Sequence, residues 1–275
     1  MSQVRTLRIV SLNVWGGVVL DPLLAFVREQ APRTDLFCLQ EVLDGPELIP
    51  LECRFRTTLF RELSDALPDF DGVFVPVVAW DQPLPGGGSG RVPYGLATFA
   101  RRSLPLVSRR EVWVLDHQDT LDAVPGLHPV RRWLQVTELR VTGGVALVGN
   151  FHGMARPGTK LDSAERLEQS RAIRRVADGH AGPVVLVGDF NLLPDTESVR
   201  LLGHGLRNLV LERGIRTTRS RLNPYFGTPQ EQPHANYAFI SPEIEVERFE
   251  VPDLAISDHL PMLMTLRFPE PPSVS

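Results

Sequence analysis

The chain has little cysteine, no excess of basic residues and no long apolar run. Its 275 residues include two cysteines, Cys38 inside an apolar stretch and Cys53 in a charged one. Cysteines so placed give neither a disulfide framework nor the ligand spacing of a zinc knuckle, so a reducing compartment fits. The formal net charge of -4 at pH 7 weakens the case for a nucleic-acid substrate without excluding it, because an active site can be locally basic.

No segment has the character of a membrane anchor or a leader. Residues 1–8 lack a long apolar region, and no later stretch approaches the roughly 20 apolar residues of a transmembrane helix. We therefore expect a cytoplasmic protein with no transmembrane segment and no obligate protein partner. The apolar content of 43% is ordinary for a globular protein. We expect residues 1–275 to form one domain, with a short flexible C-terminal tail at about residues 269–275.

The sequence does contain short apolar runs that stop abruptly at polar side chains. In the clearest case, residues 184–187 are all Val or Leu, which predicts a strand that is covered on both faces. Asp189 and Asn191 follow it, and because they are two apart an extended chain directs both side chains to the same side. Ligands of layered α/β proteins gather outside the carboxyl ends of strands, so we expect a functional site here.

Other predicted strands end or begin beside polar residues of the same kinds, which are Asn13, Glu41, His152, and the pair Asp258 and His259. Carboxylates, a carboxamide and water are the ligands that a hard divalent ion such as Mg²⁺ or Mn²⁺ takes, whereas a zinc site would have more His or Cys. A histidine among oxygen donors suits the orientation of an attacking water and the stabilisation of a phosphorane-like transition state. The set predicts hydrolysis of a phosphate ester.

The remaining pattern predicts four helices, over residues 21–30, 51–66, 163–178 and 196–202. In the first of them, Asp21 would be the N-cap and Pro22 the first helical residue. Residues 81–93 contain a glycine run that does not suit regular structure, so we expect a mobile surface loop there. Residues 216–233 are expected to be a loop as well, because they have few apolar residues and several turn formers.

Five short motifs occur at these strand ends, and they read Ser11-Leu12-Asn13, Leu39-Gln40-Glu41-Val42, Gly149-Asn150-Phe151-His152, Gly188-Asp189-Phe190-Asn191 and Ser257-Asp258-His259-Leu260-Pro261. In the same order they resemble the motifs of the endonuclease/exonuclease/phosphatase superfamily, which includes abasic-site endonucleases, deoxyribonuclease I, neutral sphingomyelinases and inositol-polyphosphate phosphatases. The resemblance covers nearly the whole chain. It implies a four-layer α/β sandwich, in which two mixed β-sheets pack face to face with helices on the outer faces and the active site lies at one rim.

The resemblance also implies a metal site and a mechanism. Glu41 would bind Mg²⁺ or Mn²⁺, with Asn13 and Asp258 beside it. The implied chemistry is in-line displacement by water, with metal-stabilised charge and no covalent enzyme intermediate.

Four further residues take catalytic roles by the same resemblance. Asp189 would position or deprotonate the attacking water, and Asn191 would hold that water or a phosphate oxygen. His259 would contact the scissile phosphate, and His152 would do so from another side.

One position departs from the family pattern. Members commonly show Asp-Tyr-Ile-Phe-Val-Ser, with the aspartate orienting the catalytic histidine, whereas this chain has Asn236 at the start of the corresponding segment. A carboxamide can hold either tautomer of an imidazole but cannot stabilise imidazolium by charge. We therefore predict a slower enzyme, or one in which His259 acts mainly as a neutral donor.

The substrate itself stays open. Arg156 and Lys160 follow His152 and are candidates to bind a substrate phosphate, although a charged loop is more often only solvated. The leading hypothesis is a phosphodiesterase. A DNA or RNA nuclease, a phosphomonoesterase acting on a phosphorylated polyol, and a catalytically weak scaffold that keeps the fold are the alternatives, so the partner would be a small molecule, a lipid head group or a nucleic acid.

Overall fold

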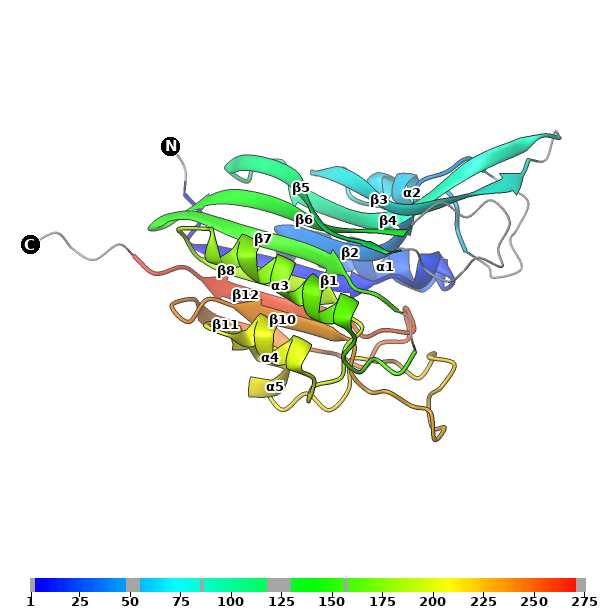
Figure 1. Cartoon of the computed structure of the whole chain (residues 1–275). Coiled ribbons are helices and arrows are strands. Elements are labelled where there is room, and N and C mark those ends of the chain that lie inside the picture. The colour runs from blue at the N-terminus through cyan, green and yellow to red at the C-terminus, as the bar shows by residue number, and fades with distance from the viewer. Residues whose placement is uncertain (1–2, 48–54, 85–86, 118–129, 156–157, 271–275) are drawn as a thin grey trace, which may run out of the picture.

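The computed structural model describes residues 3–47, 55–84, 87–117, 130–155 and 158–270. The described residues form two mixed six-stranded β-sheets that pack face to face, with helices on both outer faces (Figure 1). The layers are α1 and α2, the first sheet, the second sheet, and then α3 to α5. This is the four-layer α/β sandwich that the motifs predict, and the fold class is confirmed.

The first sheet has the strand order β11-β12-β1-β2-β4-β3. Its strands are β1 (Thr6–Asn13), β2 (Leu36–Leu43), β3 (Phe70–Pro83), β4 (Ser89–Arg101), β11 (Glu245–Glu250) and β12 (Met262–Arg267). The second sheet has the order β5-β6-β7-β8-β10-β9. Its strands are β5 (Leu106–His117), β6 (Val130–Val141), β7 (Gly144–His152), β8 (Val184–Asp189), β9 (Arg207–Asn208) and β10 (Asn236–Ile240).

The helices within the described ranges are α1 (Leu20–Gln30), α2 (Leu59–Ala66), α3 (Ala164–Asp178), α4 (Glu197–Gly203) and α5 (Leu209–Glu212), with short 3-10 turns η1 (Trp15–Gly17) and η2 (Ala31–Arg33). Two of them begin as the sequence predicts. Ser163 caps α3, because its side chain accepts a hydrogen bond from the Arg166 N–H, and Thr196 caps α4 by accepting one from the Val199 N–H. Neither helix is long and apolar enough to cross a membrane, and the same is true of every other helix within those ranges.

The central strands are buried on both faces. In β1, Ile9 lies in the core that the two sheets share, and its neighbour Val10 lies in the core beneath α1 and α2. Cys38 and Leu39 of β2 divide in the same way between the two cores, as the alternation of side chains along a strand requires. Burial raises the pKa of Cys38 to about 12, which keeps it an inert thiol. Cys53 lies outside the described residues.

Two helix predictions were wrong in part. Helix α1 begins at Leu20 with Val19 as N-cap, so Asp21 lies inside the first turn and is no cap. Helix α2 begins at Leu59, and Phe55 is not helical. The ring of Phe55 instead packs over Gly16, whose φ is +57° and where a Cβ would come within 2.6 Å of the ring. Residues 51–54 lie outside the described part of the chain.

The loop predicted over residues 81–93 was also wrong at both ends. Strands β3 and β4 pair as far as Pro83 and Ser89, so they form one long hairpin that projects from the body of the sandwich (Figure 1). The turn is short, because the Gly87 N–H donates to the Leu84 carbonyl and the Leu84 N–H to the Gly88 carbonyl. Glycines 87 and 88 supply the positive φ values that this turn needs. Gly87 and Gly88 therefore lie at the end of a hairpin rather than in a wide loop.

Strands from the two ends of the chain share one sheet, since β1 lies between β12 and β2. This pairing supports one domain over the whole chain, which stays a prediction, as does the flexible tail, because residues 271–275 lie outside the described part.

Candidate active site

The strand-end residues of the second sheet lie side by side. Asp189, the last residue of β8, is the register partner of His152 at the end of β7. On its other side it is the partner of Asn236, the first residue of β10. All three side chains are at most 4% exposed. The topology thus brings three residues that are far apart in the sequence into one buried row.

Glu41 reaches the same place from the first sheet through a β-bulge. Gln40 pairs with Leu96 and Val42 with Gly95, so Glu41 is the extra residue on β2. Its φ is +61°, a value that a residue without special surroundings rarely takes. The bulge aims the carboxylate out of the sheet and into the site, which a regular strand would not do.

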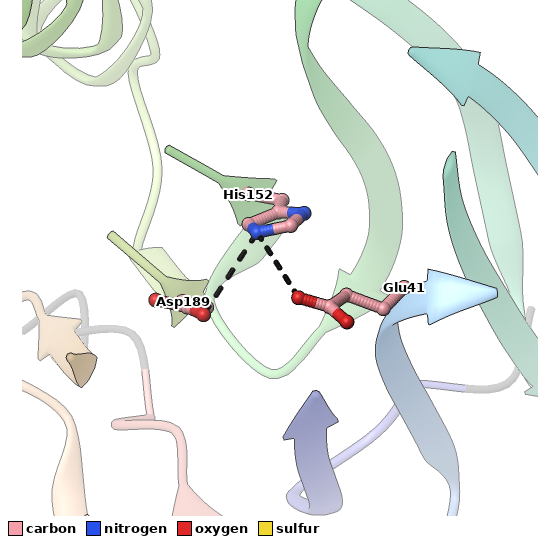
Figure 2. A group of neighbouring side chains, drawn as sticks. All are labelled: Glu41, His152 and Asp189. Carbon is pink, nitrogen blue, oxygen red and sulfur yellow. Dashed lines mark ion pairs between the residues drawn. The ribbon is translucent and has the colours of Figure 1, made fainter. Parts of the chain in front are cut away.

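Glu41, His152 and Asp189 could together hold a cation. Each offers one ligand atom, and these atoms all lie within 4.8 Å of one another (Figure 2). The His152 Nε2 is 3.8 Å from Glu41 Oε1 and 3.8 Å from Asp189 Oδ2. Neither ring nitrogen of this buried histidine has a hydrogen-bond partner within the described ranges. Burial lowers the pKa of His152 to about 4, so the ring is neutral at physiological pH.

Asn13 links the two carboxylates. Its Nδ2 donates to Glu41 Oε1 and to Asp189 Oδ2, each at 2.9 Å. Its Oδ1 accepts the Trp15 N–H at 3.0 Å, which fixes the orientation of the amide. Burial and the neighbouring Asp258 carboxylate raise the pKa of Glu41 to about 7. Two carboxylates so close to one amide form a site that a divalent cation would stabilise.

Asp189 is held in place from its own strand end. Its Oδ1 accepts the backbone N–H of Asn191 at 3.0 Å, and Asn191 adopts φ +54° to make this turn. Burial opposes ionisation of Asp189, but the two facing imidazoles and the cations Arg219 and Lys160 outweigh it and hold the pKa of Asp189 well below its usual value. The buried group is therefore a carboxylate throughout the physiological pH range.

Gly188, just before Asp189, has a steric role that can be tested. Its φ is +142°, and a Cβ would collide with the carbonyl oxygen of Phe151 on β7. We expect Gly188→Ala to lower the free energy of unfolding by on the order of 3 kcal/mol, measured by urea denaturation. Gly144→Ala is the matched control, because Gly144 has φ +150° and nothing lies within 4 Å of its Cβ position. If the two variants lost the same free energy of unfolding, the destabilisation would come from backbone strain rather than from the contact with Phe151.

The second histidine is held in one tautomer. Arg219 Nη1 donates to His259 Nε2, and a guanidinium has no acceptor, so Nε2 carries no proton. The proton is then on Nδ1, which donates to Asn236 Oδ1 at 2.5 Å. Burial, and after it Arg219, holds the pKa of His259 well below its usual value. Asn236 therefore accepts from a neutral ring and leaves its own Nδ2 without a partner among the described residues.

Asp258 is held by two residues of the loop predicted over residues 216–233. Its Oδ2 accepts hydrogen bonds from Arg219 Nη1 and Asn223 Nδ2, each at 3.1 Å. Burial raises the pKa of Asp258. This predicted metal ligand is thus not one of the three residues whose ligand atoms lie within 4.8 Å of one another, although its charge is close enough to raise the pKa of Glu41.

Of the two predicted phosphate-binding residues, Lys160 lies in the site and Arg156 lies outside the described residues. Lys160 is 7% exposed, and burial together with Arg219 lowers its pKa to about 8. Sequence reasoning missed Arg219 and Asn223, which belong to the loop predicted over residues 216–233. Their only local signal was their charge or polarity, which surface loops share.

Most of these polar residues line a cavity of about 820 Å³. Its walls include the carboxylates Glu41, Asp189 and Asp258 and the aromatic rings Trp15, Phe55, Tyr94 and Tyr225, of which Tyr94 is hydrogen-bonded to Glu41. Cavities of this size accommodate small organic ligands.

Residues 10–259 match the model of the endonuclease/exonuclease/phosphatase family. The chain belongs to this family. Its members are hydrolases that act on phosphate esters. A search of curated proteins finds no match.

Solved structures share the fold at low sequence identity. A family protein from Beutenbergia cavernae is 23% identical with a TM-score of 0.65, over 96% of this chain and 72% of that one. One from Leptotrichia buccalis is 16% identical with a TM-score of 0.66, over 95% and 100% of the two chains. A mannosyl-6-phosphatase from Bacteroides thetaiotaomicron is 18% identical with a TM-score of 0.62, again over 95% and 100%. At these identities the likeness is one of fold.

Proposed function

We propose that the protein is a divalent-metal-dependent phosphodiesterase, in which an activated water attacks the phosphorus in line with the leaving group. The observation that carries this proposal is the convergence of ionised Asp189, Glu41 and neutral His152 on one buried point, with ligand atoms within 4.8 Å. The fixed carboxylate can accept a proton, and the cavity beside it has room for an ester.

We propose Mg²⁺ or Mn²⁺ as the cofactor, bound by Glu41 with Asn13 and Asp258 beside it. The fit is supported by the Nε2 of His152, which has no hydrogen-bond partner among the described residues and faces two carboxylate oxygens, and by the raised pKa of Glu41. When bound, such an ion acts as a Lewis acid on a phosphate oxygen and lowers the pKa of water. His152 and Asp189 each place a ligand atom within 4.8 Å of Glu41, so they would keep the ion close to the Glu41 carboxylate.

Four residues of the chain would position the water and the phosphate. Asp189 would orient the attacking water and take its proton, because it stays ionised and is fixed by the Asn191 N–H. Asn191, whose Nδ2 donates to the Gly153 carbonyl at 3.3 Å, lines the cavity where it can hold that water or a phosphate oxygen. His152 and His259 would flank the phosphate from two sides.

The neutral His259–Asn236 pair predicts a gain of activity. We expect Asn236→Asp to raise kcat by roughly 10-fold below pH 7 and to shift the acidic side of the pH–rate profile, because a carboxylate would favour the imidazolium form of His259. The groups that face this ring are Asp189, Asp258 and Arg219. The measurement is kcat against pH on bis-p-nitrophenyl phosphate. An unchanged profile would show that Asn236 does not limit the enzyme.

Phosphomonoester hydrolysis is the second candidate. A monoester carries more negative charge than a diester, and the cavity presents two cations, Lys160 and Arg219, beside the carboxylates. The mannosyl-6-phosphatase of the same fold is a precedent for a phosphorylated polyol. A nuclease activity is the third candidate because the family includes nucleases, but the net negative charge of the chain does not favour binding to nucleic acid.

A panel of substrates tests the proposal. Bis-p-nitrophenyl phosphate, p-nitrophenyl phosphate, plasmid DNA and sphingomyelin would each be incubated with Mg²⁺, Mn²⁺ or EDTA, beside the Asp189→Ala variant. We expect turnover of the diester that requires the metal and Asp189. Faster turnover of the monoester would establish the second candidate, and absence of turnover on every substrate would favour a scaffold. The cytoplasmic location and the lack of an obligate partner stay predictions.

A further inference from the structure

Arg219 occupies a central place in the cavity without an assigned role. Its side chain is 11% exposed, and its Nη1 donates to Asp258 Oδ2 at 3.1 Å and to His259 Nε2. The backbone on either side of Arg219 is hydrogen-bonded to the segment that carries Asp258 and His259. The Ser220 N–H donates to the Asp258 carbonyl, and the Leu260 N–H donates to the Thr218 carbonyl. Although it comes from a loop, Arg219 is fixed relative to the predicted catalytic residues.

Among the residues that the structure describes, only one nitrogen of this guanidinium has a hydrogen-bond partner. Nε and Nη2 make no hydrogen bond to a residue in the described part of the chain, and neither atom is fully buried. Arg219 itself lines the 820 Å³ cavity. A guanidinium held at one nitrogen, with its other N–H groups open to a cavity, is arranged to bind an oxyanion.

The neighbouring histidine does not offer the same donor. His259 accepts from Arg219 at Nε2 and donates from Nδ1 to Asn236, so in this arrangement it has no N–H to give to a phosphate oxygen. Asn236 carries no charge that would add a second proton to the ring. Beside His259, Arg219 therefore supplies a positive charge and N–H donors that the histidine does not.

We propose that Arg219 is a catalytic residue that binds a non-bridging oxygen of the reacting phosphate through Nε and Nη2, which rests on the phosphoesterase function proposed above. His259 and Asp258 are then the acceptors that orient the guanidinium. In phosphoryl transfer the transition-state charge lies on the equatorial oxygens, so a fixed cation there lowers the barrier.

The charges around the cavity agree with this role. Its described lining contains three carboxylates, Glu41, Asp189 and Asp258, and two cations, Lys160 and Arg219. The side chains alone therefore carry an excess of negative charge, and loss of Arg219 would increase that excess where the substrate must bind. If Arg219 only neutralised Asp258, its remaining N–H groups would not need to face the open cavity.

The test replaces Arg219 with methionine and measures two independent quantities. On bis-p-nitrophenyl phosphate, we expect Arg219→Met to lower kcat by about 10²- to 10³-fold while KM changes much less. Methylguanidinium added at sub-denaturing concentration should restore part of kcat. In the metal-free protein, calorimetry should show roughly 10-fold weaker binding of inorganic phosphate, because charge-assisted hydrogen bonds are lost.

Arg221→Met is the matched control, because Arg221 is exposed on the same loop; we expect it to leave kcat and phosphate affinity unchanged. Arg219→Lys keeps the charge without the planar fork, should give intermediate values, and replaces the methionine variant if that one does not fold. A kcat within about 5-fold of wild type, or a loss that methylguanidinium does not relieve and that leaves phosphate affinity unchanged, overturns the role of Arg219. If the wild-type protein hydrolyses nothing, the proposed function fails, and the phosphate-binding measurement alone decides on Arg219.

Discussion

Asp189→Asn is expected to lower kcat/KM by about 10³- to 10⁴-fold, the largest effect of any single substitution in this chain. The amide has the shape of the carboxylate but cannot accept a proton from water. The substitution would also break one hydrogen bond. Asp189 accepts from both Asn13 Nδ2 and the Asn191 N–H, and the new N–H₂ group would face one of these two donors. The measurement is the steady-state rate on the best substrate of the panel with saturating metal.

The control for this variant is Asp195→Asn. Asp195 is exposed on the turn that follows the same strand, and its removal should leave kcat/KM within about 2-fold of wild type, as for surface substitutions away from a site. An Asp189→Asn enzyme that retained more than a tenth of wild-type activity would show that another group takes the proton. Circular dichroism and the urea midpoint would establish that both variants fold.

Glu41→Gln is expected to weaken binding of Mn²⁺ by on the order of 100-fold, because it removes the carboxylate of the bulge while keeping its size. Isothermal titration calorimetry on the metal-free protein measures this directly. Activity should fall with it and recover in part at high metal concentration. Glu47→Gln, at an exposed position a few residues farther along the chain, is the control and should bind Mn²⁺ as the wild type does.

The affinity for the metal should also depend on pH. Burial and Asp258 raise the pKa of Glu41 to about 7, so below pH 7 a proton occupies the group that the metal needs. We expect affinity for Mn²⁺ to rise as the pH increases from about 6 to 8, with release of close to one proton per ion at the acidic end. The Glu41→Gln variant should lack this dependence. An affinity that is flat over this range would mean that Glu41 is not the ligand that titrates.

Much of the candidate site could be predicted because its residues follow strands. The run of Val and Leu before Asp189 and the short apolar stretch before His152 mark strands by local pattern. Strand ends of a layered fold meet at a rim, and the register of β7, β8 and β10 places His152, Asp189 and Asn236 side by side as that rule requires. The replacement of the usual aspartate by Asn236 could be predicted as well, because the motifs of the family occur in a fixed order along the sequence.

What failed depended on contacts between segments rather than on the pattern within one segment. The hairpin of β3 and β4 extends through residues 81–83 and 89–93 because the two strands pair with each other, which overrides the turn preference of the glycines. Phe55 left the predicted helix because its ring packs over Gly16. Gly16 is far from Phe55 in the sequence, and the hairpin pairs residues such as Asp81 and Arg91 across its turn, so periodicity along one segment could not show either outcome.

The sequence by itself determined the fold family and the kinds of residues at the rim, because strand patterns and short motifs are local and are read in chain order. Only the tertiary structure decided how they act on each other. The β-bulge that aims Glu41, the burial that keeps His152 and His259 neutral, and the arrival of Arg219 from a loop all arise from packing between segments far apart in the chain. Desolvation and hydrogen bonding across such distances set the charge of each group, and no stretch of sequence encodes them alone.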